Sequence, residues 1–185
     1  LITVDDLWHV EFPAVMKVAT AKIIHKKAVG GVAFVHNLPA AQQAFVEMMR
    51  VTRTAGGRLS EGVLVQPEIE GATEMMLGAK RDPAFGIIVL VGLGGVFVEV
   101  AKDTALRLGP VDKDLATEMV SSLRVVRHLT HQQHTQVVHA LVQMSTLMYE
   151  HPQIVEIDIN PLALTAHGPL VLDARVFTTI EAASA

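Results

Sequence analysis

The amino-acid sequence predicts an α/β fold of α+β character, in which antiparallel hairpins alternate with helices. Half of the 185 residues are hydrophobic, so the chain has enough apolar side chains for a sizeable core. Short β-branched runs, such as residues 87–91, indicate buried strands. Other segments, such as residues 136–150, carry apolar residues at every third or fourth position, which is typical of amphipathic helices. The length fits one domain or two small lobes.

The first half of the chain is expected to contain four strands and one helix. Pro39 suits the first turn of the helix, and the pair Gly56-Gly57 ends it. The turn residues Glu70-Gly71 separate the last two strands. The expected elements are strands over residues 14–19 and 32–35, a helix over 39–54, and strands over 62–66 and 73–79.

The second half is expected to contain two strands, two helices and a final hairpin. Asp112 is a suitable N-cap for the first of these helices, because its carboxylate can accept hydrogen bonds from the free N–H groups of the first turn. In the second helix, an apolar stripe is formed by Val137, Leu141, Met144 and Met148. The expected elements are strands over residues 87–91 and 96–101, helices over 112–123 and 136–150, and strands over 154–160 and 170–176.

The bulk composition excludes several classes of function. The net charge is −4, whereas a nucleic-acid-binding protein needs an excess of basic residues for the phosphates. There is no cysteine, which excludes disulfides and thiolate chemistry and fits a reducing, cytoplasmic location. No apolar run reaches the length of a membrane span, and no signal peptide is visible. The chain opens at Leu1 without an initiator methionine, which suggests a fragment of a longer protein.

The most informative stretch is the acidic end of the last hairpin. In a strand, residues two apart share a face, so Glu156, Asp158 and Asn160 should project to one side. If the hairpin turns at residues 166–167, Asn160 lies opposite Asp173. Carboxylates this close repel one another unless a cation joins them, and oxygen ligands of this kind suit Mg²⁺. A magnesium site and a solvated strand face beside a tight turn are both compatible with these residues.

Two basic features near the N-terminus favour phosphate binding. Lys17 lies within an apolar strand, where a lysine is costly unless it meets an anion. The alternative is an edge strand on which Lys17 faces water. The loop 20–31 is basic and ends in Gly30 and Gly31, and glycines let backbone amides approach a phosphate closely. This loop by itself is also compatible with a basic surface turn.

Two other motifs are less specific. The glycines of residues 92–95 invite comparison with a dinucleotide-binding loop, but the third glycine and the following helix of that pattern are missing. Glu99 and Asp103, after this loop, are better candidates for the wall of a polar site. His131 and His134 could share a helix face and ligate zinc, but no well-spaced carboxylate completes the set. We expect a solvated, irregular histidine-rich segment there instead.

An ordered set of short motifs extends over nearly the whole chain, from about residue 11 to residue 175. The motifs are Phe12-Pro13-Ala14-Val15-Met16-Lys17, His25-Lys26, Val29-Gly30-Gly31-Val32, Gly62-Val63-Leu64-Val65-Gln66, Gly71-Ala72-Thr73-Glu74, Asp82-Pro83-Ala84-Phe85-Gly86, Gly92-Leu93-Gly94-Gly95, Val98-Glu99-Val100, Glu156-Ile157-Asp158-Ile159-Asn160-Pro161 and Asp173-Ala174-Arg175. In order and spacing this set resembles the ATP-grasp domain of the NDP-forming acyl-CoA synthetases, relatives of the succinyl-CoA synthetase β subunit.

The resemblance implies one ATP-grasp domain over residues 1–185, in which two α/β lobes with antiparallel-rich sheets surround a nucleotide cleft. The lobes would span about residues 11–66 and 67–185, and the implied cofactors are ATP or ADP and Mg²⁺. The implied site residues are Lys17, Lys26, Gly30 and Gly31 at the phosphates, Val65 and Gln66 at the adenine, Glu74 at the nucleotide, Lys26 and Glu99 in catalysis, and Asn160 and Asp173 as magnesium ligands, with Glu156 and Asp158 beside them.

The activity implied by the resemblance is that of a ligase: acyl-CoA + ADP + phosphate ⇌ carboxylic acid + CoA + ATP. The phosphoryl group would be carried by a phosphohistidine on a separate CoA-binding, α-type domain, through which the acyl-CoA substrate also enters. That partner would belong to the same protein or complex, and the isolated chain is expected to be incomplete. No nucleic-acid or membrane partner is expected, and a homo-oligomer stays open.

Two departures from the family pattern leave alternatives open. Lys27 and Ala28 stand where the family has a Ser-Asp pair, and residues 130–134 contain no arginine where a Gly-x-Arg-Gly segment is expected. These departures favour a regulatory nucleotide- or acyl-CoA-sensing module, like that of some multidomain protein lysine acetyltransferases. The retained Lys17 and Asn160 favour an intact nucleotide site. A structural subunit needed only for assembly is a third option.

Overall fold

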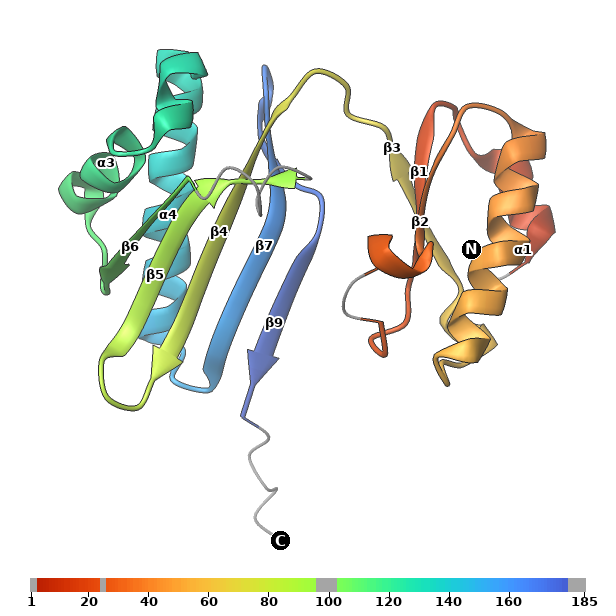
Figure 1. Ribbon diagram of the computed structural model, residues 1–185, viewed down its shortest axis with the longest axis horizontal. Coiled ribbons are helices and arrows are strands. Elements are labelled where there is room, and N and C mark those ends of the chain that lie inside the picture. Colours follow the sequence, from red (N-terminus) through yellow and green to blue (C-terminus); the bar gives the residue numbers. More distant parts are fainter. Residues whose placement is uncertain (1–2, 24–25, 96–102, 180–185) are drawn as a thin grey trace, which may run out of the picture. The chain divides into compact units, whose positions relative to one another are not determined.

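The computed structural model describes residues 3–23, 26–95 and 103–179, and the chain divides into two compact units. We call Leu1–Glu70 unit 1 and Gly71–Ala185 unit 2. Each unit is an antiparallel sheet with helices packed on one of its faces (Figure 1). This mixture of helices and antiparallel sheets agrees with the predicted fold class.

Unit 1 is a three-stranded sheet covered by one long helix. The strands have the order β2-β1-β3, and both neighbours run antiparallel to β1. The helix begins one residue before Pro39, because the side chain of Asn37 accepts a hydrogen bond of 3.0 Å from the N–H of Ala40. The elements are β1 (Ala14–Val18), β2 (Val32–Val35), α1 (Leu38–Thr54) and β3 (Val63–Pro67), with short 3-10 helices η1 (Val4–His9), η2 (Lys27–Val29) and η3 (Leu59–Glu61).

Alternate residues of β1 point to opposite faces of this sheet. Met16 and Val18 pack with Phe45 of α1 in the core of unit 1. Lys17 therefore lies on the face opposite the helix, where it is only 7% exposed. Because β1 is the central strand, the alternative in which Lys17 faces water from an edge strand is wrong.

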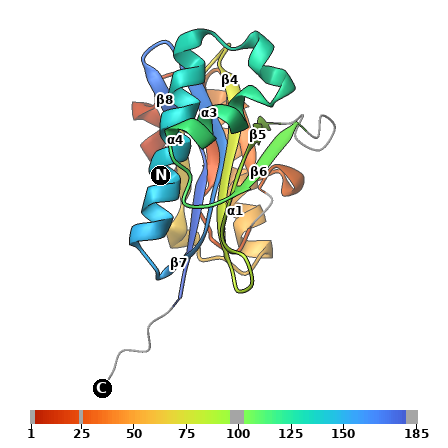
Figure 2. The same ribbon diagram turned by 90° about the vertical axis from the view of Figure 1, so that its left-hand side faces the viewer.

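Unit 2 is a six-stranded antiparallel sheet with two helices on one face. The strands have the order β6-β5-β4-β7-β8, and β9 pairs with β7. Leu141 and Met148 of α4 pack in one core with Leu77 and Val89 of the sheet, and Figure 2 shows α3 and α4 in front of the strands. The elements are β4 (Thr73–Asp82), β5 (Gly86–Leu93), β6 (Thr104–Leu108), α3 (Lys113–Ser121), η5 (Arg124–His128), α4 (His131–Glu150), β7 (Ile154–Thr165), β8 (Gly168–Val171) and β9 (Ala174–Thr178).

The histidine-rich segment differs from its prediction, because it is the start of α4. The helix begins at His131 rather than at residue 136. Thr130 and Gln133 form a capping box: the N–H of Gln133 donates to the Thr130 hydroxyl at 3.2 Å, and the N–H of Thr130 donates to the Gln133 side chain at 2.9 Å. The expectation of an irregular segment is therefore wrong.

Three further expectations for unit 2 need correction or lie beyond the described ranges. The prediction omitted β6, a short strand whose Leu106 and Leu108 are exposed and therefore hide the usual alternation of buried and polar residues. The expected strand over residues 170–176 is divided between β8 and β9. The expected strand over residues 96–101 falls outside the described residues.

No helix in the described part of the chain is long and apolar enough to cross a membrane.

Candidate functional site

The hairpin that follows α4 has the predicted register. Thr165 pairs with Gly168, and Leu164 pairs with Pro169, so the chain turns at residues 166–167. Earlier in β7, the backbone N–H of Asn160 donates a hydrogen bond of 3.0 Å to the carbonyl oxygen of Asp173. The prediction that Asn160 lies opposite Asp173 is confirmed.

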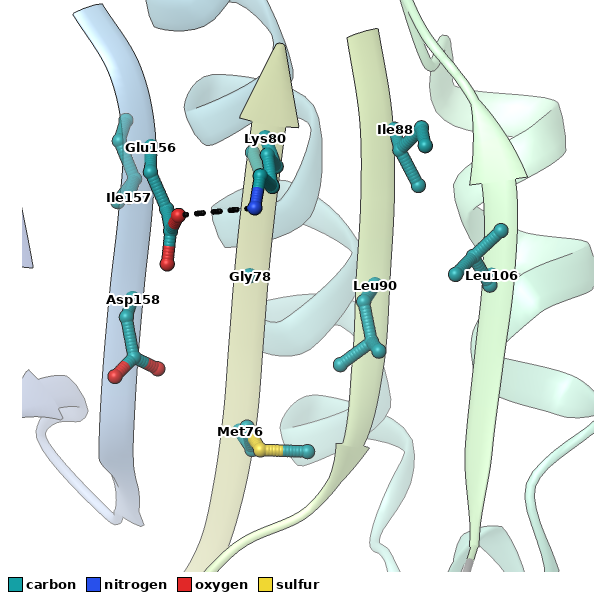
Figure 3. Close-up of a pocket in the computed structure, with 10 residues that line it drawn as sticks. Met76, Gly78, Lys80, Ile88, Leu90, Leu106, Glu156, Ile157 and Asp158 are labelled. Atoms are coloured by element: carbon teal, nitrogen blue, oxygen red, sulfur yellow. Dashed lines mark ion pairs between the residues drawn. The ribbon is translucent and has the colours of Figure 1, made fainter. Parts of the chain in front are cut away.

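Glu156 and Asp158 lie on the open face of the sheet of unit 2, which is the face opposite α3 and α4. They pair with Lys80 and Gly78 of β4, and paired residues share a face. Nζ of Lys80 lies 3.7 Å from Oε2 of Glu156. Figure 3 marks this ion pair with a dashed line. Glu156 therefore forms an ion pair with a lysine that the sequence analysis did not consider. The sequence did offer a signal for this ion pair. Lys80 lies two residues after Gly78, so in a strand the two residues share a face.

Negative charge gathers around Asp158. Burial is the main cause that raises the pKa of this carboxyl; Arg175 lowers it, and the carboxylates of Glu156 and Asp173 raise it further. Within the described ranges, however, no group of three or more His, Cys, Asp or Glu side chains could hold a metal ion. The expected cluster of three carboxylates that binds a cation is therefore not found, and Glu156 pairs with Lys80 instead.

The glycine loop after β5 meets the start of β4 and the middle of β7. The N–H of Gly94 donates to the carbonyl oxygen of Glu74 at 2.8 Å, and the N–H of Gly95 donates to Oδ1 of Asn160 at 3.4 Å. A side chain at Gly95 would collide with the carboxylate of Glu74. The fold thus brings together three residues that are far apart in the sequence: Glu74 at the start of β4, Gly95 after β5 and Asn160 in β7.

In unit 1, the glycine pair closes a tight turn directly before β2. The N–H of Gly31 donates to the carbonyl oxygen of Lys26 at 2.7 Å, and the carbonyl of Gly31 accepts from the N–H of Val18 at 2.9 Å. Gly30 has a φ of 72°, and a Cβ at Gly31 would lie 2.8 Å from Cγ2 of Val18. These contacts explain both glycines and hold the loop against the strand that carries Lys17.

The two residues expected at the adenine, Val65 and Gln66, lie in β3 of unit 1. Val65 pairs with Met16 of β1, and Gln66 pairs with Val15. Both are half-buried in this strand, next to the central strand that carries Lys17. They therefore lie on the same small sheet as the lysine, as expected.

Two other candidates have different outcomes. Asp103 is buried, and its two carboxylate oxygens each accept a backbone hydrogen bond of 2.8 Å, from Arg124 and from Val125. It caps the start of η5, so its expected place in the wall of a polar site is wrong. Glu99 lies outside the described residues.

The histidine considered as a zinc ligand has a neighbour of another kind. Nε2 of His134 is 3.2 Å from the hydroxyl of Ser121, an ordinary polar contact between α4 and α3.

A hollow of about 400 Å³ lies on the open face of unit 2 (Figure 3). Its floor is apolar, and Lys80, Glu156 and Asp158 form its charged side. Gly78 has no side chain to fill the hollow, and a Cβ there would lie 3.8 Å from its nearest neighbouring atom. The apolar lining residues are Met76, Ala79, Ile88, Leu90, Leu106 and Ile157. Such a lining suits a ligand with an apolar part and a charged part.

Comparison with known proteins establishes the class of this fold and site. The profile of the ATP-grasp domain matches residues 3–178. The chain therefore belongs to the ATP-grasp domain family. The fold class predicted from the sequence and the resemblance to that family are confirmed.

Within this family, the chain is similar to ADP-forming acetate–CoA ligases. It is 34% identical to the β subunit of acetate–CoA ligase (ADP-forming) I from Pyrococcus furiosus, over 89% of this chain and 75% of that subunit. It is 35% identical to acetate–CoA ligase (ADP-forming) I from Archaeoglobus fulgidus, over 89% of this chain and 25% of that protein. The chain thus spans only about a quarter of the length of the latter relative.

Solved structures of one protein match closely. They are structures of acetyl-coenzyme A synthetase 1 from Candidatus Korarchaeum cryptofilum. In its complex with coenzyme A and Ca-AMPCP the TM-score is 0.82 at 29% identity, over 95% of this chain and 80% of that chain. A second structure, with coenzyme A and Mg-AMPPCP, gives 0.73 at 26% identity, over 96% and 82%; its phosphohistidine segment points towards the nucleotide-binding site.

Proposed function

We propose that this chain is the nucleotide-binding domain of an ADP-forming acyl-CoA ligase. It exchanges a phosphoryl group between Mg-ADP or Mg-ATP and a phosphohistidine on a CoA-binding, α-type domain. The complete reaction is acyl-CoA + ADP + phosphate ⇌ carboxylic acid + CoA + ATP. Support comes from the ligase relatives, which give the regulatory alternative no support. A cytoplasmic location stays a prediction.

The observation that carries this proposal is the pairing of Asn160 with Asp173 at the polar end of the hairpin. Mg²⁺ is usually held by one or two carboxylates together with substrate phosphates, so a carboxamide and a carboxylate suffice for it. The raised pKa of Asp158 reflects its burial among carboxylates, a field that a cation would relieve. These residues therefore fit the ion, with Asn160 and Asp173 as its protein ligands and Asp158 nearby.

Each remaining site residue has a role in positioning the nucleotide. Lys17, buried on its sheet, and Lys26, at the glycine turn, bind phosphate oxygens. The backbone of Val65 and Gln66 contacts the adenine, and Glu74 contacts the nucleotide. When bound, Mg²⁺ would supply positive charge that offsets the charge of the phosphates. Phosphoryl transfer requires mainly such positioning and charge stabilisation. Glu99 and Lys26 are the proposed catalytic residues.

Calorimetric titration with ADP and ATP, each with and without Mg²⁺, tests the nucleotide site. We expect binding that is markedly tighter with Mg²⁺. Absence of binding to both this chain and its full-length parent would overturn the proposal. Phosphoryl transfer is tested in the full-length parent with labelled ATP: a labelled, acid-labile phosphohistidine supports the ligase function, and its absence despite nucleotide binding supports a sensing module instead.

A further inference from the structure

The glycine loop after β5 has a conformation that the dinucleotide-binding pattern does not explain. Gly95 has a φ of 73°, and its N–H donates to Oδ1 of Asn160 at 3.4 Å. On its other side, a Cβ would collide with the carboxylate of Glu74. The preceding Gly94 is equally confined, since a Cβ there would lie 2.6 Å from the backbone carbonyl of Met75. Gly95 therefore lies directly between two residues of the proposed nucleotide site.

The contact with Gly95 distinguishes the two ends of the Asn160 side chain. A carboxamide has an oxygen, which accepts hydrogen bonds and can ligate a hard cation, and an NH₂ group, which does neither. A backbone N–H can only donate, so Gly95 selects the orientation in which Oδ1 lies on its side. The oxygen has two lone pairs, and one remains available after this hydrogen bond forms.

We propose that Gly95 is a positioning residue for the metal site: its N–H orients the Asn160 carboxamide so that Oδ1 is available to Mg²⁺. This inference rests on the proposed nucleotide and magnesium binding. Gly95 does not itself touch the cation. Glycine is required because the positive φ of Gly95 strains any other residue and a Cβ would also collide with the carboxylate of Glu74. A shift of the loop that relieves this strain takes the N–H away from Asn160.

The first test is the variant Gly95→Ala, with Gly86→Ala as its matched control. Gly86 also has a positive φ, 76°, but nothing lies within 4 Å of a Cβ there. It therefore carries the same backbone strain at the distant β4–β5 turn. ADP binding is measured by calorimetry with and without Mg²⁺. We expect Gly95→Ala to weaken binding with Mg²⁺ about tenfold, the scale of one lost hydrogen bond, and to leave binding without Mg²⁺ unchanged. Gly86→Ala should change neither.

The variant Asn160→Asp provides a second, independent arm. Both ends of a carboxylate are oxygens, so its orientation does not matter for a cation. In the Asn160→Asp background, Gly95→Ala should therefore cost less than about threefold in the presence of Mg²⁺. An equal tenfold loss in both backgrounds would mean that the loop is merely strained, and the proposal would fall. So would an unchanged affinity of Gly95→Ala in the native background.

Hydrogen exchange of the Gly95 amide tests the proposal even if the Gly95→Ala variant does not fold. In the Mg-ADP complex, this amide should exchange more slowly in the native protein than in Asn160→Ala. Identical exchange in both would overturn the proposal. If the native protein shows no binding of ADP with Mg²⁺, the proposed function fails and this inference fails with it. If the native protein binds but neither Gly95→Ala nor exchange shows the expected change, only the inference fails.

Discussion

The two units differ in charge as well as in size. Unit 1 holds seven of the 15 lysines and arginines and seven of the 19 aspartates and glutamates, so it is balanced. The whole net charge of −4 therefore belongs to unit 2. The small sheet buries a cation, Lys17, on its helix-free face, whereas the large sheet places Glu156 and Asp158 on its own helix-free face. Each sheet thus packs its core against its helices and places these charged groups on the opposite face.

The proposed function implies a division of labour: unit 1 supplies the phosphate-binding lysines, and unit 2 supplies the magnesium ligands. Phosphates need cations, and magnesium needs carboxylate and carboxamide oxygens. Variants in one unit should therefore change a different property from variants in the other.

The largest expected effect is on the stability of unit 2. Leu141 of α4 is fully buried in its core, so Leu141→Ala should lower the free energy of unfolding by about 2–5 kcal/mol through lost contacts and a cavity. Leu147→Ala, on the same helix at a position that is 41% exposed, is the matched control and should cost far less. Urea unfolding followed by far-UV circular dichroism measures both. Equal losses would contradict the core assigned to this helix.

The next effect concerns the acidic site of unit 2. Asp173→Ala should weaken binding of ADP with Mg²⁺ by about 2–4 kcal/mol, the scale of losing one partner from a charged network. Binding without Mg²⁺ should not weaken. Asp114→Ala, an exposed carboxylate of α3, should leave both affinities unchanged. Calorimetry supplies the measurement, and an Asp173→Ala variant that keeps its magnesium dependence would remove Asp173 from the metal site.

A smaller effect, of a different kind, is expected in unit 1. Lys17→Met should weaken nucleotide binding by about 1.5–3 kcal/mol, the contribution of a hydrogen bond to a charged group. Because the proposed contact of Lys17 is with phosphate rather than metal, the loss should be similar with and without Mg²⁺. The exposed Lys22→Met, in the same unit, serves as the control. If Lys17→Met weakened nucleotide binding only in the presence of Mg²⁺, the proposed division of roles between the two units would be wrong.

The smallest effect is the pH dependence of stability at Asp158. The fold raises the pKa of this carboxyl, so the folded state binds its proton more tightly than the unfolded state does. The stability associated with Asp158 is therefore fully present below the unfolded pKa and is lost as pH rises through the folded pKa. Asp158→Asn should raise Tm slightly at neutral pH, and the difference from the native protein should vanish in acid. A difference that stays constant with pH would contradict the raised pKa.

Local patterns in the sequence predicted what depends on neighbours along the chain. The helix after Pro39 and the N-cap at Asp112 follow from capping and turn chemistry, and both are found. The register that places Asn160 opposite Asp173 follows from the position of one turn, because side chains alternate with a period of two. The ordered motifs likewise identified the family over nearly the whole chain.

Tertiary structure decided which distant residues meet. The sequence left open whether Lys17 faces water, and only the strand order makes its strand central. Asp103 was a candidate for a polar site until its contacts with Arg124 and Val125 assigned it to a cap. The hydrogen bond between Gly95 and Asn160 joins residues 65 apart in the chain.

The physical reason is the range of each interaction. A helix cap or a two-residue turn is decided by groups within four residues of one another, so neighbouring letters encode it. Strand order and the choice of which loop meets which strand depend on the burial of whole apolar faces. No single segment contains that information. The sequence by itself therefore determined most of the elements, the hairpin and the family, and only the packed sheets decided which polar groups lie near one another.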